Sequence, residues 1–88
     1  PVVRVFAGPQ GQPKEWSVAA KGARREDVEG WMADSLRACA EHGEQHGVLV
    51  AVQNHGDFVS TGPEHLSLLK RTGHAWCGAL VDTGMYLT

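Results

Sequence analysis

Two short apolar runs, each of which stops abruptly in polar residues, constrain the fold of this chain more than any other feature. The first, GVLVAVQNHGDF, covers Gly47–Phe58, and the second, CGALVDTGMYL, covers Cys77–Leu87. Their apolar parts lack the alternation of apolar and polar residues, which is typical of parallel strands covered on both faces. Polar groups at the carboxyl ends of such strands are where α/β enzymes place their chemistry. The two runs therefore predict neighbouring strands whose ends meet at an active-site edge.

A helix-like segment precedes the first of these runs. A β-branched stretch predicts a strand over Val2–Ala7, and a long loop then covers Gln10–Gly22. From Arg25 to His46 the apolar residues recur at helical spacing, which predicts a helix. Its expected inward stripe consists of Val28, Trp31, Met32, Leu36, Cys39 and Ala40.

A second helix is predicted between the two apolar runs. The residues Thr61-Gly-Pro-Glu64 match a capping box, so we expect a helix over Pro63–Arg71 with Leu66 and Leu69 facing inward. The strands around it are expected at Val48–Val52 and Gly78–Val81. The order is therefore strand, helix, strand, helix, strand.

This order predicts a parallel sheet. Crossovers between parallel strands are right-handed in nearly all proteins, so the three strands should lie parallel, with α/β architecture. An open three-stranded sheet would leave both edges bare. We therefore expect the chain to be a segment of a larger α/β protein, either an eightfold barrel or a doubly wound sheet.

The composition and net charge exclude some classes of binding partner. The net charge of −2 and pI of about 6.2 give no basic surface for nucleic acid or an anionic membrane. No apolar run approaches the roughly 18 residues of a membrane span. Cys39 and Cys77 are expected to be reduced, half-buried thiols of a cytoplasmic protein. The chain begins at Pro1 without Met, so we expect that the natural N-terminus lies upstream.

Strand alternation gathers several polar side chains on one face. Arg4, Gln53, His55 and Asp82 should all point away from the β-branched faces that pack on helices. Buried polar groups that converge in this way need partners, a metal or a substrate. Two alternatives remain open, because Asp82 could cap the next helix or pair with Arg4, and His55 could be a structural histidine. Asn54 lies on the opposite face and could serve as a hydrogen bonder of the loop.

Taken together, VRVFAG, VAVQNHGDF and GALVDTGMYL resemble the sugar phosphate isomerase/epimerase family, also called the xylose isomerase-like TIM barrels. The three motifs cover nearly all of the chain, in the family's order. The resemblance implies that residues 1–88 are a partial barrel domain, a parallel βαβαβ segment of a (β/α)8 TIM barrel that is incomplete at both ends. This segment would correspond to roughly strands four to six.

The resemblance also implies a site and a reaction. In the family a divalent metal ion (Mn, Mg, Co or Zn) binds neighbouring oxygens of a sugar or sugar phosphate, and a proton then moves through an enediolate. The family's Asp falls on Asp82 and its Glu on Gln53, which makes these the expected metal ligands. The family's His falls on His55, which is expected to bind substrate together with Arg4 and Asn54. Further ligands would lie on later strands.

Gln53 departs from the family pattern, because an amide brings no charge and cannot act as a general base. The leading interpretation is still that the full-length protein is a metal-dependent isomerase or epimerase. One alternative is a non-catalytic sugar-binding or scaffold protein of the same superfamily. Another is an endonuclease IV-like DNA-repair barrel, which the lack of a basic patch disfavours. Each interpretation is compatible with a homo-oligomer.

Overall fold

The computed structural model of the chain describes residues 1–7, 21–55 and 58–84. Most of the loop predicted over Gln10–Gly22 lies outside these residues. The elements occur in the expected order and within one residue of their expected bounds: β1 (Val2–Phe6), α2 (Arg25–His46), β2 (Leu49–Gln53), α3 (Gly62–Thr72) and β3 (Cys77–Leu80). The predicted α/β class is confirmed.

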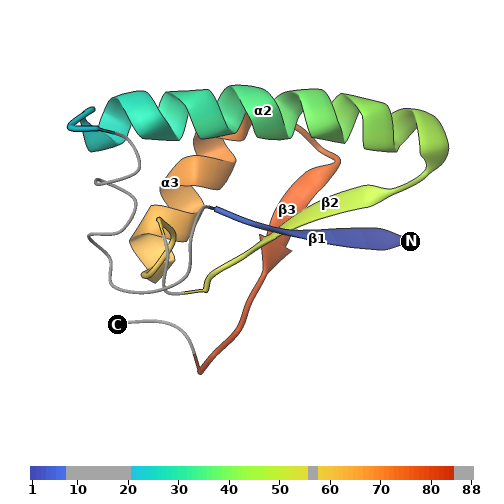
Figure 1. Ribbon diagram of the computed structural model, residues 1–88. Coiled ribbons are helices and arrows are strands. Elements are labelled where there is room, and N and C mark those ends of the chain that lie inside the picture. Colours follow the sequence, from blue (N-terminus) through green and yellow to red (C-terminus); the bar gives the residue numbers. More distant parts are fainter. Residues whose placement is uncertain (8–20, 56–57, 85–88) are drawn as a thin grey trace.

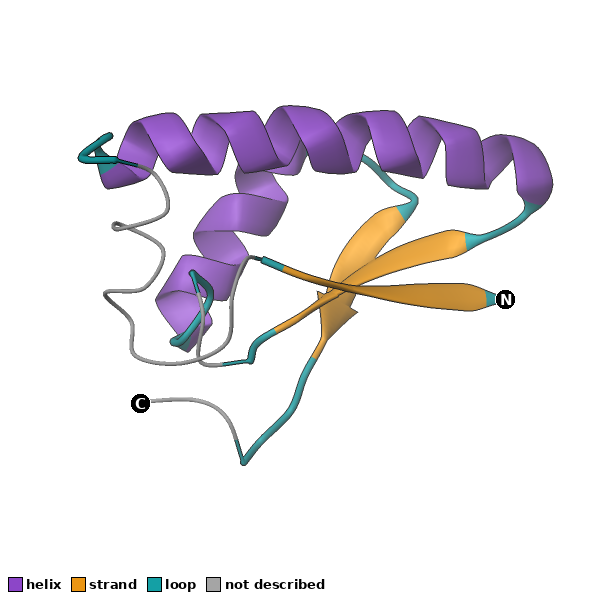
Figure 2. Ribbon diagram, viewed as in Figure 1, coloured by secondary structure: helices purple, strands orange, loops and turns teal. Residues whose placement is uncertain are grey.

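The three strands form one parallel sheet in the order β1-β2-β3. Phe6 lies opposite Gln53, and Gln53 lies opposite Leu80, so the carboxyl ends of all three strands reach the same level. Figure 2 shows that the strands run toward one side of the molecule and that the segments after them leave from that edge. The expected edge of strand ends is therefore present.

Both helices pack on one face of this sheet. Figure 1 shows α2 lying over the sheet, with α3 beside it. The apolar side chains between the helices and the sheet are almost completely shielded from solvent; they are Ala7, Val28, Ala33, Val52, Phe58, Val59 and Leu68. Burial of this cluster stabilises the layer by roughly 25 cal/mol for each Å² of apolar surface removed from water.

The opposite face of the sheet, which we call the open face, carries the other half of the strand residues. By strand alternation they are Val2, Arg4, Phe6, Leu49, Ala51, Gln53, Gly78 and Leu80. Neither α2 nor α3 covers this face, and the Phe6 ring is 45% exposed there. The open face is thus the side of the sheet on which Arg4 and Gln53 lie, and only part of it is exposed, because Gln53 and Ala51 are buried.

Helix ends follow the sequence signals. Gly47 ends α2 in the left-handed conformation with φ of 69°, which a residue without Cβ adopts at little cost, and the chain then enters β2. At the start of α3, the Thr61 hydroxyl accepts a hydrogen bond from the Glu64 N–H, and the Glu64 carboxylate accepts one from the Thr61 N–H. The predicted capping box is confirmed.

The predicted inward stripe of α2 is only partly covered, which corrects the sequence-based expectation. Trp31 is 59% exposed and Cys39 is exposed, whereas Ala33 is buried. The reason is that α3 and the sheet meet one side of α2, and the other side borders an open apolar crevice of about 320 Å³ next to β1. Likewise Leu66 on α3 is 53% exposed, because Leu68 occupies the inward position.

The cysteines match the prediction only in part. Both are free thiols, and Cys77 is half-buried, but the expected half-burial of Cys39 is wrong. Burial, with a smaller contribution from the Cys39 thiol, raises the pKa of Cys77 above its usual value. Within the ranges that the structure describes, no helix is long and apolar enough to cross a membrane.

Candidate functional site

The structure brings Gln53 and Asp82 together at the ends of two adjacent strands. Gln53 is the last residue of β2, and Asp82 follows the end of β3 by two residues. The Gln53 Nε2 donates a hydrogen bond of 3.2 Å to the Asp82 Oδ2. The two metal ligands implied by the family resemblance are therefore in direct contact.

The other end of the Gln53 amide has no hydrogen-bond partner among the residues that the structure describes. Its Oε1 is buried and accepts no hydrogen bond within the described structure, and the residue as a whole is only 5% exposed. Leaving a buried acceptor unpaired costs about 1–3 kcal/mol, so such groups are few in native proteins. A ligand that pairs with this oxygen would offset that cost.

Asp82 is held in place although it lies beyond the regular strand. The Asn54 Oδ1 accepts a hydrogen bond of 2.7 Å from the Asp82 N–H, and the Asn54 Nδ2 donates one of 2.7 Å to the Asp82 carbonyl oxygen. The Asp82 Oδ1 also accepts from the Gly84 N–H at 3.0 Å, which turns the chain after the carboxylate. The Asn54 side chain thereby extends the pairing of β2 and β3 by one step.

These contacts give Asn54 a positioning role. The side chain is fully buried, and both ends of its amide are used by the Asp82 backbone. Strand alternation places Asn54 on the face opposite Gln53. The substrate contact expected from the resemblance stays a prediction for Asn54, and the structure shows how it orients Asp82.

Three side chains of the open face form a stacked row beside this pair. The ring centroids of Phe6 and His55 are 4.5 Å apart, with a tilt of 35° between the ring planes. The Arg4 guanidinium carbon lies 5.1 Å from the centroid of the Phe6 ring, so the cation faces the aromatic surface. The expected convergence of Arg4 and His55 on one face is therefore present. No ion pair joins Arg4 to Asp82, both of which the structure describes.

Phe6 is the member of this row that the sequence analysis did not select. It is level with Gln53 across the sheet, and nearly half of its surface is exposed. The available signal was its place two residues after Arg4 on the same face of the strand. An exposed aromatic ring at a strand end is a typical platform for the apolar face of a ligand.

The loop between β2 and α3 carries His55 and is anchored in the core. Phe58 and Val59 are fully buried, the Phe58 N–H donates to the Ala7 carbonyl oxygen at 3.2 Å, and the His55 N–H donates to the Val59 carbonyl oxygen at 3.3 Å. On α3, the buried His65 Nε2 lies 2.7 Å from the Val52 carbonyl oxygen. This contact fixes the end of β2 next to the site.

The described residues supply too few ligands to hold a metal ion by themselves. Among the described residues no group of three or more His, Cys, Asp or Glu side chains is placed to hold a metal. The oxygens that the chain does offer are the Asp82 carboxylate and the free Gln53 carbonyl oxygen. These are hard oxygen donors, which suit Mg²⁺ or Mn²⁺.

Comparison with protein-family models, with curated proteins and with solved structures found no match.

Proposed function

We propose that this chain forms part of the metal-binding wall of a xylose isomerase-like (β/α)8 barrel that isomerises or epimerises a sugar or sugar phosphate. One observation carries the proposal: the Asp82 carboxylate contacts the Gln53 amide at the ends of two neighbouring parallel strands, and the buried Oε1 of that amide has no partner among the described residues. A divalent cation at this point would satisfy the unpaired oxygen and the negative charge together.

The arrangement of the elements supports a barrel. Consecutive strands in the order β1-β2-β3, with both helices on one face, are what successive units of a barrel supply. One half of a doubly wound sheet has the same local order, and the motif resemblance favours the barrel. In a barrel the open face would be the interior, which is consistent with its exposed apolar side chains.

Different side chains of the open face would bind the metal ion, the sugar and the phosphate group. A bound divalent cation would polarise adjacent oxygens of a keto or aldo sugar. Asp82 supplies the negative charge, and Gln53 supplies a neutral oxygen that cannot take up a proton. The Phe6 ring can pack against the C–H face of a sugar, His55 can hydrogen-bond a hydroxyl, and the Arg4 guanidinium suits a phosphate group.

A second candidate function has its own supporting observation. The Gln53 Nε2 donates to the Asp82 carboxylate, so the amide already partners the acidic group without any metal. A Glu at this position would instead repel Asp82 unless a cation lay between them. This favours, as the alternative, a non-catalytic sugar-binding or scaffold member of the superfamily.

The first test is a calorimetric titration of the full-length protein with Mn²⁺. We expect the wild type to bind Mn²⁺ and Asp82→Ala to bind at least about tenfold more weakly, since it lacks the charged ligand. Asp34→Ala is the matched control, because Asp34 is an exposed helix carboxylate paired with Arg37. Equal Mn²⁺ affinity of wild type and Asp82→Ala would refute the metal assignment. Sugar binding by the wild type without Mn²⁺ would support the non-catalytic alternative.

A further inference from the structure

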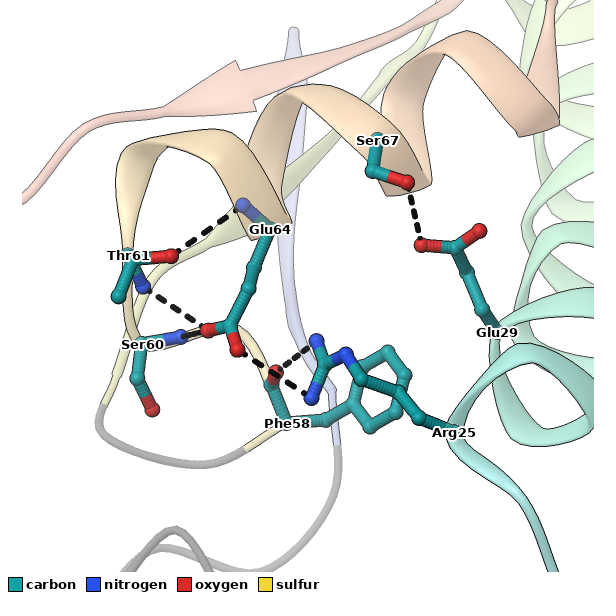
Figure 3. Close-up of polar contacts among 7 residues, drawn as sticks. All are labelled: Arg25, Glu29, Phe58, Ser60, Thr61, Glu64 and Ser67. Carbon is teal, nitrogen blue, oxygen red and sulfur yellow. Dashed lines mark hydrogen bonds and ion pairs between the residues drawn. The ribbon is translucent and has the colours of Figure 1, made fainter.

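The N-terminus of α2 contributes one long side chain to the loop that carries His55. The Arg25 Nη2 donates a hydrogen bond of 2.7 Å to the Phe58 carbonyl oxygen, and the guanidinium carbon lies 3.8 Å from the centroid of the Phe58 ring. The Arg25 Nη1 also forms an ion pair of 3.4 Å with the Glu64 Oε2. Figure 3 shows the guanidinium between the Phe58 residue and the Glu64 carboxylate.

Glu64 links this contact to the start of α3. Its other carboxylate oxygen, Oε1, accepts hydrogen bonds from the Ser60 N–H at 3.0 Å and the Thr61 N–H at 3.1 Å (Figure 3). One carboxylate therefore joins the end of the loop, the cap of α3 and the Arg25 guanidinium. The Arg25 and Glu64 side chains are only 34% and 30% exposed, so solvent screens this pair less than a fully exposed one.

A continuous set of contacts leads from Arg25 to the imidazole of the site. Arg25 holds Phe58, the neighbouring Val59 accepts the backbone hydrogen bond of His55, and His55 packs on Phe6. We propose that Arg25 is a positioning residue that sets the place of His55 on the open face. The proposal gives the α2 terminus a role in substrate contact, and this role rests on the function proposed above.

The chain offers a matched control on the same helix. Arg37 also reaches from α2 to backbone carbonyl oxygens of a distant segment, those of Thr72 and Arg71, both at 3.0 Å. It pairs with an acidic residue, Asp34, and is 42% exposed. Its contacts lie at the C-terminal end of α3, away from the strand ends. Loss of Arg37 should therefore lower stability without moving His55.

The experiment measures the His55 ring by NMR in the full-length protein, with assignment by a His55→Gln variant. The nearby Phe6 ring shifts the His55 ring protons, and Phe6→Leu removes this shift. We expect Arg25→Met to bring the His55 signals close to those of Phe6→Leu, and Arg37→Met to keep the wild-type signals while lowering the unfolding midpoint. Arg25→Lys, which keeps the charge opposite Glu64, replaces Arg25→Met if the latter does not fold, and should displace the signals less.

Two outcomes would overturn the proposal: wild-type His55 signals in the Arg25 variant that folds, or an equal displacement in Arg37→Met. Added Mn²⁺ separates this inference from the proposed function. Mn²⁺ bound near Asp82 should broaden the His55 signals in the wild type and broaden them less in Arg25→Met. If Mn²⁺ broadens nothing while the Arg25 variant still displaces His55, the metal site is wrong and the positioning role stands.

Discussion

Replacing Gln53 with Glu would place a second carboxylate where the wild-type amide now donates to Asp82 across 3.2 Å. Two unit charges roughly 4 Å apart repel by about 4 kcal/mol at an effective dielectric constant of about 20. Asp82 is partly exposed, so screening by solvent and salt makes this figure an upper bound for the repulsion. The substitution also removes the hydrogen bond from the Gln53 Nε2, which contributes about 1 kcal/mol to stability.

The pH dependence of this penalty has a definite sign. The buried site and the neighbouring charge both raise the pKa of the introduced carboxyl, so between acidic and neutral pH the folded variant binds more protons than the unfolded chain. The stability of Gln53→Glu relative to wild type should therefore fall as pH rises toward neutrality. Lowering the pH through the carboxyl range should remove most of the deficit.

Divalent metal should reverse the effect. A cation held between the two carboxylates removes their repulsion and binds more tightly than it does beside the neutral amide. Denaturant unfolding of the full-length protein, followed across pH with and without excess Mn²⁺, measures both effects. We expect the Gln53→Glu deficit at neutral pH to shrink or change sign when Mn²⁺ is added.

Two further variants isolate the repulsion. Gln53→Met removes the hydrogen bond without adding charge, so its deficit should vary with pH much less than that of Gln53→Glu. In the double variant Gln53→Glu/Asp82→Asn the partner charge is gone, so the part of the pH dependence that comes from Asp82 should disappear, and the part that comes from burial should remain. A Gln53→Glu deficit that is independent of pH, or a pH dependence that is equally strong in the double variant, would refute the repulsion between these two side chains.

Two other predictions concern Asn54 and the two cysteines. Asn54→Leu should lower the free energy of unfolding by about 1–3 kcal/mol, because it removes both hydrogen bonds to the Asp82 backbone; an unchanged denaturation midpoint would contradict this. Thiol labelling near pH 8 should modify the exposed Cys39 before Cys77, and labelling of Cys77 should accelerate at higher pH, because its pKa is raised by burial. Mass spectrometry of the labelled peptides measures the order, and faster labelling of Cys77 would contradict the burial.

The amino-acid sequence by itself determined the elements and the edge at which the polar groups meet. Helical spacing, the capping box at Thr61 and the left-handed glycine at position 47 act over a few residues, so they can be read without knowing the packing. The alternation of strand residues likewise placed Gln53 and His55 on one face and Asn54 on the other.

Tertiary structure decided which of these groups touch and what each contact does. Asn54 binds the Asp82 backbone, the Gln53 Oε1 has no donor in the part of the chain that the structure describes, and Arg25 reaches Phe58, 33 positions away. It also left Trp31 exposed, because helical periodicity gives the apolar side of a helix but not how far its neighbours cover it. Contacts between distant segments depend on how whole elements pack, and local propensity contains no information about that packing.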